Sequence, residues 1–172
     1  IMHVIRQYIV ASEKVLFEGD GYSEAWAKEA EKRGLPNVKT TPLALDAMVT
    51  DKAKKLFESN NIYSHSELEA RHEIELEKYI KKVQIESRIM GELATSHVLP
   101  TAIRYQNLLA NNIRGLKEAG LSDAAFANQK QILEKISEHI NKTADLVEKM
   151  IEARKVCNNM DNTRTKAIAY QS

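Results

Sequence analysis

The chain has 172 residues, of which 43% are hydrophobic, and this composition supports a folded core and excludes a disordered segment. Its 25 Lys and Arg are opposed by 24 Asp and Glu, so no net charge draws the chain to nucleic acid or to an anionic membrane, and we expect neither as a partner. The single cysteine, Cys157, cannot form an internal disulfide, and no apolar run approaches the ~20 residues that cross a bilayer, which favours a cytoplasmic location.

Glycine and proline are scarce, with six and three residues respectively, too few for a chain of many strands and tight turns. The sequence therefore predicts an all-α fold, in which short helices are followed by long antiparallel helices that form a bundle. The first residue is Ile1 rather than an initiator methionine, which we interpret as a cut in a longer chain.

The first third is predicted to consist of small helices and loops. Apolar spacing favours helices over residues 1–16, 24–33, 41–49 and 50–60. Two glycines around Asp20 predict a turn, and Ser23 is the expected N-cap of the helix that Gly34 ends. Trp26 on that helix is expected to anchor a local core.

A very long helix is predicted to begin at Ser64, which forms a capping-box pattern with Glu67. Its first turns are acidic and its later turns basic, as the helix dipole favours. Gly91 and Pro100 interrupt the pattern, and since an interior proline removes a backbone hydrogen bond, we expect a kink near Pro100 and helix again through Leu116.

A second long helix is predicted to return along the first. Gly120 ends the first helix and Ser122 and Asp123 are the expected caps of the next. Apolar residues then recur with heptad spacing, which predicts a packed seam: Phe126, Leu133, Ile136, Ile140, Thr143, Val147 and Met150. Residues 163–170 could begin another helix. We divide the chain into a linking segment, residues 1–62, and a long-helix bundle, residues 63–172.

Glu69 and His72 have the i, i+3 spacing of ligands in di-iron bundle proteins. Such a site needs a second copy of the pattern, and none exists in the sequence, because Glu138 and His139 are adjacent and Glu92 and His97 are five residues apart. We therefore assign no metal ligand. The remaining alternative, a metal-dependent bundle enzyme, is tested by metal analysis and by replacing Glu69 and His72.

No other residue group predicts chemistry. The histidines are scattered and are expected to be structural: His3, His65, His72, His97 and His139. Cys157 continues the apolar seam and is expected to be a buried, inert thiol. The Gly19-Asp20-Gly21 turn lacks the further glycine and lysine of nucleotide-binding loops. We assign no catalytic, cofactor-binding or metal residue.

Several sequence segments resemble the region that follows the catalytic domain in type III glutamine synthetases. They are residues 17–26, with Glu29-Ala30 and residues 33–37; residues 67–71 with 77–79; residues 99–106; and residues 162–166. The resemblance implies a parent enzyme that joins ammonia to glutamate with ATP and Mg²⁺ or Mn²⁺, assembled as a dodecamer of stacked rings. It also implies an upstream domain that holds all of the catalytic residues, and a chain that continues beyond Ser172.

The resemblance further implies partners for these helices, namely the upstream catalytic domain and neighbouring subunits of the homo-oligomer. We expect the helices to pack, to help assembly or to regulate, and the isolated region to be inactive. The alternative from another class is a free-standing helical scaffold or adaptor, because apolar stripes can also bind an external helix. Such a protein would have no ligase domain before Ile1.

Overall fold

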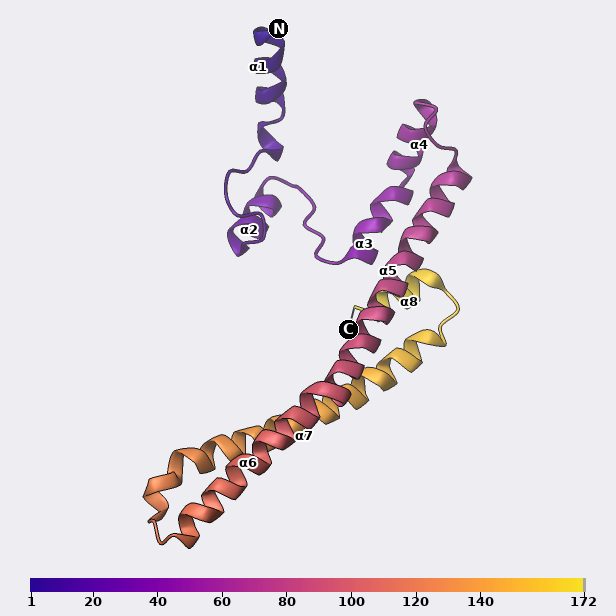
Figure 1. Cartoon of the computed structure of the whole chain (residues 1–172). Coiled ribbons are helices and arrows are strands. Elements are labelled where there is room, and N and C mark those ends of the chain that lie inside the picture. Colours follow the sequence, from indigo (N-terminus) through magenta and orange to yellow (C-terminus); the bar gives the residue numbers. More distant parts are fainter. Residues whose placement is uncertain (172) are drawn as a thin grey trace. The chain divides into compact units, whose positions relative to one another are not determined.

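The computed structural model describes residues 1–171, so the last residue of the predicted 63–172 bundle lies outside the described residues. The described part is about 80% helical and contains no strand, which confirms the predicted all-α class. The chain divides into two compact units, Ile1–Ala44 and Leu45–Ser172. Figure 1 shows the ribbon of each unit.

The first unit begins with α1, Met2–Ala11, followed by a 3-10 turn at Glu13–Val15. The helix predicted over residues 1–16 is therefore too long. At Ser12 the backbone leaves helical geometry, with φ −99° and ψ 5°, and its N–H is shared between the carbonyls of Tyr8 and Ile9. No residue of α1 is buried, so no tertiary contact opposes the fraying of its last turn.

Local contacts organise the rest of this unit around α2, Glu24–Lys32. The Ser23 hydroxyl accepts a hydrogen bond from the Trp26 N–H, as the predicted cap requires. Gly34 ends the helix at φ 66°, and the Leu35 N–H reaches the Ala30 carbonyl at 2.8 Å, which completes a Schellman motif. Trp26 packs on Phe17 with ring centroids 4.7 Å apart.

Residues 41–49, predicted as one helix, form α3, Thr41–Leu45, and a 3-10 turn, Asp46–Val49. In the second unit the next helix, α4, spans Asp51–Ser59 and is capped by the Thr50 hydroxyl. It ends at Asn61, whose φ of 52° is the left-handed conformation expected of asparagine at this position. The chain then reverses, so that α4 lies beside the start of the next helix.

The central element is a continuous 54-residue helix. It consists of α5, His65–Leu93, a π-helical turn, Ala94–Val98, and α6, Leu99–Glu118. The predicted Ser64–Glu67 capping box is present. The interruption predicted near Pro100 takes the form of the π turn, because a wider turn moves backbone carbonyls away from the proline ring. At the start of this turn the Thr95 hydroxyl donates to the Gly91 carbonyl at 2.9 Å.

The second long helix, α7, spans Ala127–Asn158 after a 3-10 turn at Asp123–Phe126, and it runs antiparallel to α5 and α6 (Figure 1). Gly120 makes the turn at φ 83°. Ser122 takes the predicted N-cap position, with φ −70° and ψ 155°, but its hydroxyl makes no cap hydrogen bond, and the Asp123 carboxylate accepts from Lys130. The predicted seam is confirmed, since each of its seven residues is buried or half-buried.

The last helix, α8, spans Thr163–Ala169 and packs against α5. The Asn162 side chain caps it by accepting from the Thr165 N–H at 2.8 Å. Ala167 is fully buried against Leu76 and Ile80 of α5, and Leu45, Tyr79 and Tyr170 surround this cluster. This cluster joins α8 to α5 and forms an apolar core at this end of the second unit. Within the described residues, no helix is long and apolar enough to span a membrane.

Candidate functional site

Glu69 and His72 share one face of α5 but serve different contacts. The Glu69 carboxylate accepts from the Lys54 Nζ of α4 at 2.6 Å, and this hydrogen bond lowers the pKa of Glu69. His72 Nε2 lies 3.6 Å from an Asp46 carboxylate oxygen. Among the described residues, no group of three or more His, Cys, Asp or Glu side chains could hold a metal ion. Both side chains therefore contribute to contacts between helices.

The other histidines remain dispersed over the helices. His65 lies 3.2 Å from the Glu58 carboxylate at the turn between α4 and α5. His3, His97 and His139 are exposed on α1, the π turn and α7 respectively.

Asp46 forms a polar junction that the sequence pattern did not predict. Its two carboxylate oxygens accept from Arg164 Nε and Nη2 of α8, at 2.8 and 2.6 Å. This pairing holds the pKa of Asp46 below its ordinary value, with a smaller contribution from His72, and raises that of Arg164. The two residues are 118 positions apart, so only the fold could bring them together.

A second junction joins α5, α7 and α8 through three neutral side chains. The Gln84 side-chain amide donates to the Asn158 side-chain oxygen Oδ1 and to the Tyr170 hydroxyl, and the Tyr170 hydroxyl donates to the same Asn158 Oδ1 at 2.6 Å. Side-chain hydrogen bonds of this kind fix the register between helices whose apolar contacts alone are less specific.

A cavity of about 350 Å³ lies beside this junction, between α5, α7 and α8, and we call it the junction cavity. Its apolar lining consists of Val83, Leu146, Met150, Ala153, Cys157 and Ala169. Cys157 is 7% exposed, which confirms the predicted buried thiol. Lys149, Arg154, Ser87 and Tyr170 supply the polar part of the lining.

A broad apolar face of the 54-residue helix stays exposed, and we call it the outer stripe. Its members are Ile85, Ile89, Leu93, Val98, Tyr105 and Leu108, each 48% to 62% exposed. They follow one another by three, four, five and seven residues. The five-residue step spans the π turn, where a turn holds more residues than in an α-helix, so the stripe keeps to one side of the helix.

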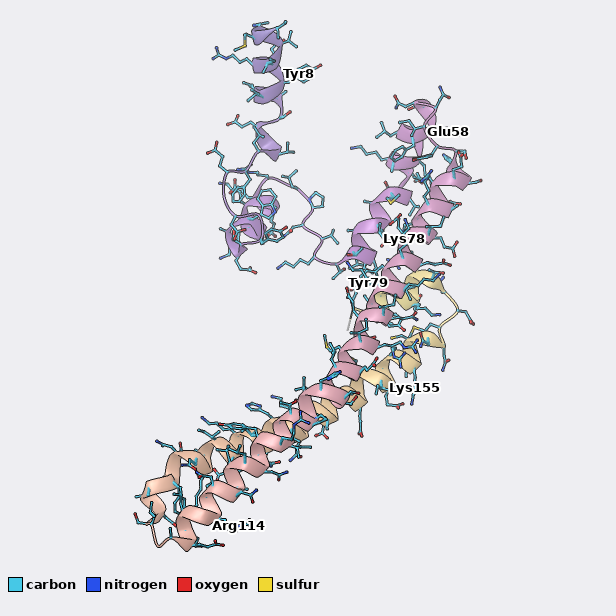
Figure 2. The ribbon with its side chains drawn as sticks, viewed as in Figure 1. Tyr8, Glu58, Lys78, Tyr79, Arg114 and Lys155 are labelled. Carbon is cyan, nitrogen blue, oxygen red and sulfur yellow. The ribbon has the colours of Figure 1, made fainter. Side chains whose placement is uncertain are left out.

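Other positions of the same helix are covered, since Gly91 and Leu109 are buried. Gly91 lies against Met150 and Val147 of α7. Charged side chains elsewhere on the hairpin project into solvent, as Figure 2 shows for Arg114 on α6 and Lys155 on α7. Several large apolar side chains exposed on one helix beside such charged surface are typical of a protein interface.

Comparison with known proteins agrees with this picture of a helical region. The family model described as the glutamine synthetase C-terminal domain matches residues 1–117. A glutamine synthetase from Bacteroides fragilis (strain YCH46) is 41% identical over 99% of the present chain. One from Butyrivibrio fibrisolvens is 29% identical over the whole of the present chain. A type-3 glutamine synthetase from Dictyostelium discoideum is 33% identical over 84% of the chain.

The chain spans about a quarter of the length of the two bacterial relatives and a fifth of the Dictyostelium protein. The sequence segments resembled the C-terminal region of glutamine synthetases. The family match over more than half of the chain and the relative that is 41% identical over 99% of it confirm this resemblance. The chain belongs to the glutamine synthetase C-terminal domain family.

Proposed function

We propose that this chain is the non-catalytic C-terminal helical region of a type III glutamine synthetase, and that the hairpin of α5, α6 and α7 packs against the catalytic domain or neighbouring subunits. In this proposal residues 1–62 link to the upstream domain and the long helices from residue 63 onward carry the packing surface. The observation that carries it is the outer stripe.

Exposure of the outer stripe to water is unfavourable in free energy. Complete burial of a large apolar side chain contributes roughly 1.5–3 kcal/mol, so even partial burial of six such side chains is a substantial driving force for association. A hairpin of two helices has a single seam, and the opposite faces of both helices can be covered only by another element. A partner surface that buries the stripe would turn this hairpin into part of a larger bundle.

The parent reaction in this proposal is the ATP-dependent ligation of ammonia to glutamate. ATP and Mg²⁺ or Mn²⁺ would be bound by the upstream catalytic domain, and we assign no residue of this chain to either. The assembly would be the dodecamer that the sequence resemblance implies. In this proposal the present residues contribute an apolar packing surface to that enzyme.

The test is made in the full-length protein. Ile89→Glu and Tyr105→Glu each place a carboxylate in the outer stripe, and a buried unpaired charge strongly opposes association. We expect both variants to lose the native oligomer in sedimentation velocity. Asn141→Glu, an exposed polar position of α7, adds the same charge outside the stripe and should leave assembly unchanged.

Activity gives a second readout. The chain by itself should form no glutamine from glutamate, ammonia and ATP, whereas the full-length protein should. Removal of residues 50–172 from the full-length protein should change its oligomeric state. An unaltered oligomer with unaltered ligase activity after that deletion would refute the proposal.

A further inference from the structure

The junction cavity has a pattern of lining that the proposed packing role does not require. Six apolar side chains form most of its surface, and two cationic residues of α7, Lys149 and Arg154, stand at its polar side. No acidic residue lines it. An apolar pocket with a few convergent charges is the arrangement that binds small amphiphilic molecules, and its volume of about 350 Å³ is within the range of such sites.

Arg154 is the more informative of the two cations. It is half-buried, yet among the residues that the structure describes it has neither an ion pair nor a hydrogen bond. It also borders a neighbouring groove of about 250 Å³ that contains Arg88 and Glu92, but no carboxylate approaches its guanidinium within salt-bridge distance. A guanidinium beside an apolar pocket and without a counter-ion is well placed to bind an anion.

The neighbouring cation behaves differently. Lys155, one residue further along α7, pairs with Glu152 at 2.7 Å and is exposed. Figure 2 shows it on the outer side of the helix. Of these two adjacent basic residues, the one at the cavity has no ion pair within residues 1–171 as the structure describes them, and the one in solvent is paired. The unpaired charge is therefore a feature of the cavity and not of the basic stretch as a whole.

We propose that the junction cavity binds a small amphiphile with an anionic head group, whose head contacts Arg154 and Lys149 and whose apolar body lies on Met150, Ala153 and Cys157. The site is formed by α5, α7 and α8 together, so ligand binding would also favour the docked position of α8. The inference is independent of the proposed assembly role.

Cys157 is a reporter for this site because it lines the cavity and is 7% exposed. The purified protein is treated with iodoacetamide, and modification of Cys157 is followed by peptide mass spectrometry. Decanoate should slow the modification in a saturable manner. Decyltrimethylammonium, which has the same apolar body and the opposite charge, should not protect the thiol at the same concentration.

Two variants test the two parts of the site, with circular dichroism to confirm the native helix content. Arg154→Met removes the charge and should weaken protection by decanoate about tenfold, the loss expected for one charge-assisted hydrogen bond. Ala153→Phe narrows the cavity and should abolish protection while the charge remains. Lys155→Met is the matched control and should behave as the native protein.

Absence of protection by decanoate would overturn the proposal. Equal protection by both amphiphiles, or full protection in the Arg154→Met variant, would overturn it as well, because either result would mean that apolar adsorption alone covers the thiol. None of these measurements depends on the oligomeric state or on ligase activity.

Discussion

Gly91 lies where the two long helices, α5 and α7, approach each other closely. A Cβ atom added at this buried position of α5 would lie 3.3 Å from the Met150 Cε and 3.8 Å from the Val147 Cγ1 of α7. Gly115 of α6 is also helical, but an added Cβ would meet nothing within 4 Å. The two glycines therefore differ mainly in the neighbouring helix, and the same substitution at each isolates the contact.

Alanine at Gly115 should stabilise the chain by up to about 1 kcal/mol, the difference in helix propensity, reduced somewhat because the position lies in the last turn of α6. At Gly91 the same gain is opposed by the approach to Met150. A distance of 3.3 Å to the end of a flexible side chain requires a shift of a few tenths of an ångström, so we expect Gly91→Ala to gain less than Gly115→Ala. Gly91→Leu should destabilise by about 1–3 kcal/mol, as overpacking of a core does.

Urea unfolding followed by circular dichroism at 222 nm gives these differences directly. Gly91→Ala in a Met150→Ala background completes a double-mutant cycle. Shortening the Met150 side chain should restore the full gain in stability from Gly91→Ala. If Gly91→Ala gained as much as Gly115→Ala in the native background, or if Gly91→Leu were neutral, the close approach of α5 and α7 at this point would be incorrect.

Four further substitutions test the core and the two polar junctions of the second unit. Leu76→Ala should cost about 2–5 kcal/mol because Leu76 is 2% exposed, whereas Leu108→Ala, at a 62% exposed position, should change the free energy of unfolding by less than about 0.5 kcal/mol in the same urea titration. Asp46→Asn should destabilise the chain at pH 7. The pKa of Asp46 is lowered in the folded state, so its stabilisation is present above the unfolded pKa and is lost as the pH falls through the folded value. The native protein and the variant should therefore converge as the pH falls below the ordinary aspartate pKa, measured by urea unfolding at several pH values. Tyr170→Phe should cost about 1 kcal/mol by removing one hydroxyl from its hydrogen-bonded junction, and an unchanged unfolding midpoint would contradict that role.

The helices and their ends were largely predictable because they depend on neighbours in the sequence. The Ser64 capping box, the left-handed Gly34 and Asn61, and the heptad seam of α7 each arise from interactions within a few residues. One predicted helix end was wrong for a tertiary reason. The helix predicted over residues 1–16 ends early, because an apolar periodicity that no other element buries does not hold the last turn.

The sequence by itself determined that this protein is helical, that two long helices return on one another and that it resembles the glutamine synthetase C-terminal region. Only the tertiary structure decided which side chains meet across the helices. One contact joins positions 118 residues apart, namely the Asp46–Arg164 pair. Others depend on three helices at once: the contacts of Gln84 with Asn158 and Tyr170, and the position of Arg154 at the junction cavity. The physical reason is that periodicity and capping are encoded by neighbours along the chain, whereas polar partners and cavities depend on the register and rotation of packed helices, which many side chains set together.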